Sequence, residues 1–138
     1  MRKELAALVL ACGLLLPATH SSARADDAAI ASVITSQIAA FQADDFNTAF
    51  EFASPMIKRQ FGTPERFGQM VQNGYPMVYR PAEVTMLDRH MTPNGLAQHV
   101  MFRDAQGDLH ILGYLMIETE VGWQINGVFP LRGRESGA

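Results

Sequence analysis

The chain has 138 residues, of which 48% are hydrophobic and 18% charged, and its formal net charge is −3. This length is typical of one domain, and the balance of residues excludes a disordered or collagen-like protein. No apolar run approaches the roughly 20 residues that a membrane-spanning helix needs. The weakly acidic charge gives no electrostatic footprint for nucleic acid.

Residues 1–25 have the features of a cleaved secretion signal peptide. A positively charged start precedes a short apolar stretch, and Ala23-Arg24-Ala25 has the small residues that a signal peptidase reads. We therefore expect cleavage after Ala25 and a periplasmic or secreted protein. The alternative is a lipoprotein anchored through Cys12. Because Cys12 is the one cysteine of the chain, the exported domain is expected to have neither a disulfide nor a thiolate nucleophile.

The first half of the remaining chain predicts helices. Apolar side chains recur at helical spacing from Ile30 to Phe41. Residue types that cap helix N-termini occur at Asp26-Asp27, Asp44-Asp45, Ser54 and Thr63, and a proline suited to the first helical turn follows the latter two. The predicted helices cover residues 27–43, 46–53, 55–61 and 64–73.

The second half predicts strands joined by tight turns. Pro76 and Pro81 favour an extended, non-helical crossover. The predicted strands cover residues 82–91, 97–104, 109–119 and 123–131, and the predicted turns lie at Asn94-Gly95, Gln106-Gly107 and Val121-Gly122. Helices followed by strands indicate an α+β domain, here residues 26–131, with helices packed on one face of an antiparallel sheet. Residues 132–138 read as a disordered tail.

The predicted turns set which side chains share a face of the sheet. Two-residue turns would place His90 opposite His99, Asp88 opposite Met101, Arg103 opposite His110 and His99 opposite Tyr114. The third turn would put Trp123, Ile125 and Phe129 on that same face. An apolar surface with a few convergent polar groups is typical of a ligand pocket. The predicted lining is His99, Tyr114 and Trp123, with Tyr79 and Arg80 at its mouth.

Other interpretations of these residues stay open. Histidines on a half-buried sheet are commonly hydrogen-bonded surface residues, and the segment 75–81 could be a rigid crossover whose Arg80 pairs with a carboxylate. Imidazole and thioether groups at His90, His99 and Met101 would suit copper in an exported protein. Asp88 could orient His99 as a general base. The phosphate-loop, dinucleotide-binding and nucleophile-elbow motifs are absent from the sequence, so we expect no cofactor.

Several segments resemble one uncharacterised bacterial family, known as a domain of unknown function. They are residues 52–55, 61–67, 74–76, 78–81 and 122–128, within a similarity that extends from about Ile30 to Leu131. That family looks like a branch of the nuclear-transport-factor-2-like superfamily, which includes ketosteroid isomerase and polyketide cyclases. The resemblance implies a cone-shaped α+β fold with a curved sheet around a pocket, often in a dimer. It implies no catalytic residue for this chain.

The sequence therefore predicts an exported, non-catalytic domain that binds a small apolar or amphipathic ligand or serves as a scaffold. One alternative is an interaction or homodimerisation module of the cell envelope, using the outer face of the sheet or the segment 75–81. The others are an enzyme with an acid–base pair in the pocket and a copper-binding protein.

Overall fold

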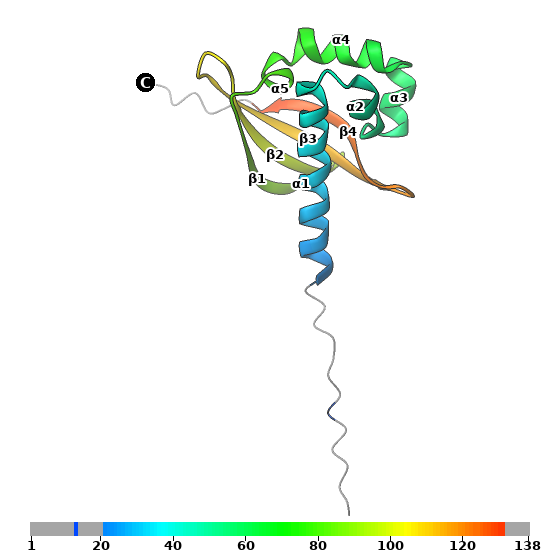
Figure 1. The fold of residues 1–138 in the computed structure, drawn as a ribbon. Coiled ribbons are helices and arrows are strands. Elements are labelled where there is room, and N and C mark those ends of the chain that lie inside the picture. The colour runs from blue at the N-terminus through cyan, green and yellow to red at the C-terminus, as the bar shows by residue number, and fades with distance from the viewer. Residues whose placement is uncertain (1–12, 14–20, 132–138) are drawn as a thin grey trace, which may run out of the picture.

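The computed structural model describes Gly13 and residues 21–131, and confirms the α+β class (Figure 1). Five helices precede four strands. The helices are α1 (Ser21–Gln42), α2 (Phe46–Glu51), α3 (Pro55–Phe61), α4 (Pro64–Gly74) and α5 (Pro76–Tyr79), and the strands are β1 (Glu83–Thr92), β2 (Gly95–Arg103), β3 (Leu109–Thr119) and β4 (Gly122–Leu131). The four strands form one antiparallel sheet in the order β1-β2-β3-β4. None of the described helices is long and apolar enough to cross a membrane.

Three of the predicted capping sites act as the sequence predicts, whereas Asp26 and Asp27 lie inside α1, which begins at Ser21. The side chains of Asp45, Ser54 and Thr63 accept hydrogen bonds from backbone N–H groups in the first turns of α2, α3 and α4, respectively. These bonds satisfy donors that a helix end otherwise leaves free. Gly62 ends α3 with φ 79°, a conformation that suits glycine. Local chemistry therefore fixes where α2, α3 and α4 begin.

The largest differences from the predicted helices lie at α5 and at the start of α1. Residues 76–79 form the helical turn α5, because Pro76 occupies its first position, where proline needs no hydrogen-bonded N–H. Helix α1 begins at Ser21 and so crosses the predicted cleavage position. Residues 1–12 and 14–20 of the predicted signal peptide, and the predicted tail 132–138, lie outside the described residues.

The hydrophobic core lies between the helices and one face of the sheet, which we call the inner face. Alternate residues of β2 and β3 enter this core together with residues of α1. The residues of β2 and β3 in this core cluster, each at most 5% exposed, are Val100, Phe102, Leu112, Tyr114 and Met116. The intervening residues of the same strands lie on the opposite face, which we call the outer face. The described helices pack against the inner face (Figure 1).

All three predicted turns are displaced. Thr92 pairs with Gly95, so Pro93 and Asn94 are the turn residues, and Thr119 pairs with Gly122 in the same way. Between β2 and β3 the connection is the longer loop 104–108, because the Asp104 side chain accepts bonds from two backbone N–H groups and contacts His110. Each displacement changes which residues lie opposite one another.

Two β-bulges displace the register further. On β1 the pairing shifts between Met86 and Arg89, so that Thr85, rather than Asp88, lies opposite Met101. On β4 the partners of Leu115 and Met116 are Gly127 and Ile125, which leaves Asn126 as the extra residue. Because side chains alternate between faces, one extra residue moves every later side chain of that strand to the other face.

Candidate functional site

A cavity of about 320 Å³ lies between the helices and the inner face of the sheet. Its volume is at the lower end of the range of about 300–1,000 Å³ that is typical of small-molecule sites. Most of its lining is apolar, contributed by α1, α3, α4, α5 and the strands β3 and β4. The polar lining residues are Gln37, Gln60, Tyr75, Tyr114 and Asn126.

On one side the cavity is bordered by α3, whose N-terminus is joined to the edge strand β4. The backbone of Ser54 donates to the carbonyl of Ile125 at 2.8 Å, and the N–H of Ile125 donates to the carbonyl of Phe52 at 2.8 Å. The Ser54 hydroxyl also donates to the Asn126 side chain at 2.7 Å. The bulge residue therefore anchors the start of α3. Met56 and Gln60 of this helix line the cavity and are also exposed, so the cavity opens to solvent beside α3.

Aromatic rings form the wall opposite the sheet. The ring of Phe67, on α4, lies 5.7 Å from that of Phe41, 5.4 Å from that of Phe50 and 5.6 Å from that of Phe61. Such tilted and edge-to-face pairs stabilise a packed cluster beyond the area that they bury. The wall is therefore a fixed part of the core.

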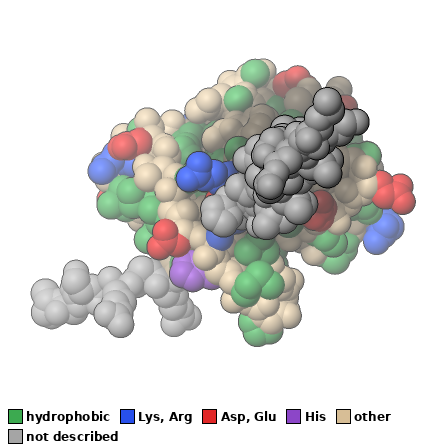
Figure 2. Space-filling view, turned by 90° about the horizontal axis from the view of Figure 1, so that it is seen from below, with side chains coloured by type: hydrophobic (Ala, Val, Ile, Leu, Met, Phe, Trp, Pro, Cys, Tyr) green, Lys and Arg blue, Asp and Glu red, His purple; other side chains and the backbone are tan. Residues whose placement is uncertain are grey.

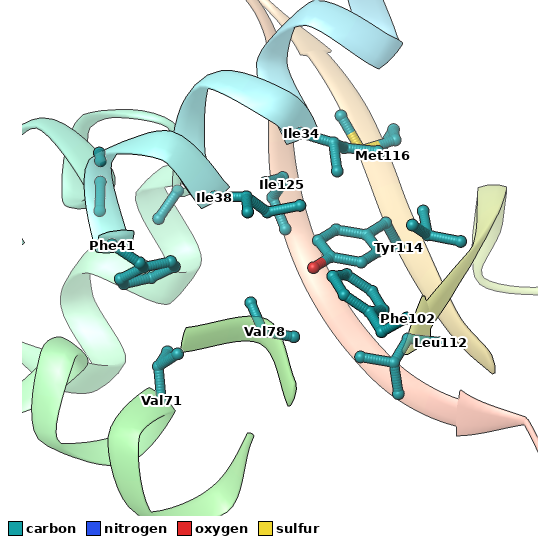
Figure 3. Packing of buried hydrophobic residues seen from close by; sticks show 14 of the residues in the cluster. Ile34, Ile38, Phe41, Val71, Val78, Phe102, Leu112, Tyr114, Met116 and Ile125 are labelled. Atoms are coloured by element: carbon teal, nitrogen blue, oxygen red, sulfur yellow. The ribbon is translucent and has the colours of Figure 1, made fainter. Parts of the chain in front are cut away.

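Tyr114 is the polar residue that distinguishes this cavity. Its side chain is 1% exposed, and its hydroxyl has no hydrogen-bond partner among the described residues. Figure 3 shows the hydroxyl extending from β3 into the space between Ile38, Val78 and Ile125. Burial raises the pKa of this hydroxyl, with a smaller contribution from Tyr75. A neutral hydroxyl that can still donate and accept hydrogen bonds therefore faces an apolar cavity.

Each of three other polar lining residues already makes one hydrogen bond within the protein. The Gln37 amide donates to the carbonyl of Ala49 at 3.1 Å, and the Tyr75 hydroxyl donates to the carbonyl of Val128 at 3.4 Å. Asn126 accepts from Ser54. These groups hold helices and strands together, whereas the Tyr114 hydroxyl performs no such role.

The structure separates His99 from Tyr114. His99 lies opposite Gly113, between the buried residues Val100 and Gln98, and its side chain is on the outer face. The prediction that His99 and Tyr114 face each other is therefore wrong by one residue of register, because the loop 104–108 replaces the expected two-residue turn. His99 does not line the cavity.

His90 and His99 do come together, although not by the predicted pairing. His90 lies opposite Ala97, and its ring stacks on that of His99 with 4.3 Å between centroids. Burial lowers the pKa of His99, His90 lowers it further, and Asp88 opposes both. The stacked imidazole pair therefore favours the neutral form of His99.

The copper interpretation stays a prediction. His90, His99 and Met101 all lie on the outer face, and the two imidazole rings are stacked with their planes 29° apart. Residues 21–131 contain no group of three or more His, Cys, Asp or Glu side chains that could hold a metal ion.

Trp123 is on the inner side of the sheet, so it and His99 are on opposite faces. Its side chain packs against the core, and its indole N–H donates to Asp26 of α1 at 3.4 Å. The bulge at Asn126 places Phe129 on the outer face instead, opposite Gly113. Trp123 lines a separate surface depression beside α1 and α2 and not the cavity.

Tyr79 and Arg80 connect the crossover to the end of α1. The Tyr79 hydroxyl donates to Asp44, and the Arg80 guanidinium contacts Asp44 at 3.0 Å and the carbonyl of Phe41 at 2.8 Å. The hydrogen bond from Tyr79, followed by that from Arg80, holds the pKa of Asp44 below its usual value. These contacts agree with the rigid-crossover interpretation, and neither residue lines the cavity.

The sequence did not identify Gln37 and Asn126 as cavity residues. Gln37 lies among the apolar residues of α1 and is 3% exposed, which periodicity alone does not distinguish from a surface position. Asn126 precedes a glycine within a strand, and such a pair is a signal for a bulge.

The described surface shows no concentration of one charge on the face seen in Figure 2, where acidic and basic side chains are scattered among apolar and polar ones. Together, the fold and the site define a small α+β domain, four antiparallel strands covered by helices, with an apolar cavity and a buried tyrosine. The chain belongs to the family described as domain of unknown function DUF4864, whose model matches residues 23–138. Comparison with curated proteins and with solved structures gave no match.

Proposed function

We propose that this protein is an exported, non-catalytic domain that binds a small, largely apolar molecule in the cavity between its helices and its sheet. The observation that carries the proposal is the Tyr114 hydroxyl. A buried polar group without a partner costs about 1–3 kcal/mol, and this one faces a cavity of ligand size. A bound molecule with an oxygen near this hydroxyl would supply the missing partner.

The chemistry of the lining favours binding over catalysis. General acid–base catalysis needs a group whose pKa lies near the working pH. The lining residues carry no carboxylate, imidazole or amine, and burial moves the pKa of Tyr114 further from neutrality. Asp88 and His99, the pair considered as a catalytic base, are not among the lining residues.

Export rests on the signal-like sequence of residues 1–25. Asp26 and Asp27, the first residues after the expected cleavage position, are both tied to the sheet. Asp26 accepts from Trp123 of β4, and Asp27 forms an ion pair with Arg89 of β1. Cleavage after Ala25 would therefore keep every one of these contacts. N-terminal mass spectrometry of the secreted or periplasmic protein tests this, and a mature chain that still begins at Met1 would contradict it.

The binding proposal is tested with N-phenyl-1-naphthylamine, a neutral dye whose fluorescence rises in apolar surroundings. Ile57 lines the cavity beside its opening, so Ile57→Trp should obstruct it and weaken dye binding at least about tenfold. Met91 is 78% exposed at the end of β1, so Met91→Trp is the matched control and should change affinity less than about twofold. Equal affinities for both variants and the unaltered protein would contradict binding in this cavity.

Self-association is the second candidate, and the outer face of the sheet favours it. Met101, Ile111, Leu115 and Phe129 lie on this face, none of them fully buried, together with the 40% exposed Ile117. The described helices leave this face uncovered (Figure 1). Ile117→Lys should shift a dimer to monomer in analytical ultracentrifugation, with Val121→Lys at a hairpin tip as the control. A monomer at all concentrations would exclude this candidate.

A further inference from the structure

We infer that the cavity selects uncharged ligands that present one hydrogen-bonding oxygen, of the ketone, ester or alcohol class, and rejects carboxylates and ammonium ions. The inference rests on the proposed function and specifies the chemistry of its ligand. It is carried by two observations, the neutral lining of the cavity and the position of its single unpartnered hydroxyl.

The lining contains no charged side chain. Its polar members are amides and phenols, and the rest are hydrocarbon or thioether groups. A buried ion needs an opposite charge or several hydrogen bonds, since removing it from water otherwise costs many kcal/mol. A carboxylate in this cavity would have neither a lysine nor an arginine to pair with.

The basic side chains nearest to the cavity lining in sequence are paired with other groups or lie on the surface. Arg80 is held by Asp44 and by the carbonyl of Phe41. Arg59 of α3 and Arg66 of α4 are exposed, and Lys58 lines the separate depression beside Trp123. None of the four is among the lining residues of the cavity. The cavity therefore offers no counter-charge to an anion.

The Tyr114 hydroxyl sets what a neutral ligand must carry. Burial raises its pKa, so it stays protonated and retains one O–H donor and its acceptor lone pairs. A ligand carbonyl would accept a hydrogen bond from the Tyr114 hydroxyl, and a ligand alcohol could also donate one to it. A pure hydrocarbon would fill the same space but leave the hydroxyl unsatisfied.

Three naphthalenes of matched shape test this selection by displacing the bound dye. They are 2-acetylnaphthalene, a neutral ketone; 2-isopropylnaphthalene, its hydrocarbon counterpart; and 2-naphthoate, the anion. We expect the ketone to bind the unaltered protein at least about tenfold more tightly than the anion. Tyr114→Phe should weaken ketone binding by roughly two- to tenfold and change hydrocarbon binding by less than about twofold.

Tyr79→Phe is the matched control, because it removes a phenol hydroxyl outside the cavity and should leave all three affinities unchanged. Anion binding as tight as ketone binding would overturn the inference, as would a Tyr114→Phe protein that binds the ketone normally. Binding of the dye without displacement by the ketone would also overturn it, while the proposed function stands. If neither the dye nor any naphthalene binds, the proposed function itself fails.

Discussion

The two faces of the sheet are covered in different ways, although the same strands form both. The inner face is covered by helices, and its side chains are packed except for the cavity beside Tyr114. The outer face carries no described helix, and its side chains cover one another: Phe129 lies over Gly113, and His90 stacks on His99. Because burial of apolar surface is the main stabilising contribution to folding, we expect the inner face to contribute more stability than the outer face, although its cavity leaves one polar group unsatisfied.

The largest expected effect comes from truncating an inner-face ring. Phe102 is fully buried, so Phe102→Ala should lower the free energy of unfolding by about 3–5 kcal/mol. Phe129, half-buried on the outer face, should lose only about 1–2 kcal/mol on the same change. Urea denaturation measures both. Equal losses would contradict the division of stability between the faces.

The packing of Phe129 on Gly113 predicts a coupled effect. A Cβ at Gly113 would collide with the Phe129 ring, so Gly113→Ala should cost about 1–3 kcal/mol. In the Phe129→Ala background the same change should cost much less, because the obstruction is gone. A double-mutant cycle in urea measures the coupling, and strict additivity would show that the ring does not lie on Gly113.

Removing the Tyr114 hydroxyl should raise the free energy of unfolding, whereas the substitutions above lower it. Tyr114→Phe keeps the ring and deletes a buried group without a partner, so the unliganded protein should gain about 1 kcal/mol of stability. Tyr79→Phe, which loses a hydrogen bond to Asp44, should not gain. Destabilisation by Tyr114→Phe would mean that the hydroxyl is satisfied in the folded protein.

The smallest expected effect is a pH dependence on the outer face. The pKa of His99 is lowered from 6.5 by burial, then by His90, against the opposing Asp88. The unfolded chain therefore binds more protons here, and stability should decline as pH falls through and below about 6.5. The lowered pKa values of Asp44, Asp45 and Asp104 act only near and below 3.8. His99→Gln should flatten the decline of the thermal midpoint between pH 7.5 and 5, and an unchanged slope would contradict it.

The sequence predicted the helices better than the faces of the sheet for a physical reason. Helix starts depend on local capping, and Asp45, Ser54 and Thr63 each cap where expected. The face of a strand residue can be predicted only if the position of the preceding turn is known to within one residue. The loop 104–108 shifts the pairing of β2 with β3 by one residue from the predicted register. The extra residue Asn126 then moved Phe129 away from the face of Trp123.

The candidate site was predicted in part. Tyr114 was selected as a pocket residue and does line the cavity, but its expected neighbours His99 and Trp123 do not. The actual lining comes largely from helices, whose apolar stripes look the same in sequence whether they meet a filled core or a cavity. Whether a cavity remains between the helices and the sheet depends on how the assembled elements pack, and the spacing of apolar residues in the sequence does not determine this.

The most direct test follows the Tyr114 ring itself in solution. The chain contains three tyrosines, so ¹³Cζ labelling gives a spectrum in which each is resolved and assigned by Tyr→Phe variants. Titration with 2-acetylnaphthalene should shift the Tyr114 signal, because the ketone oxygen accepts a hydrogen bond from the Tyr114 hydroxyl. The Tyr79 signal should stay in place. A Tyr114 signal that stays fixed at a saturating ketone concentration would contradict the account.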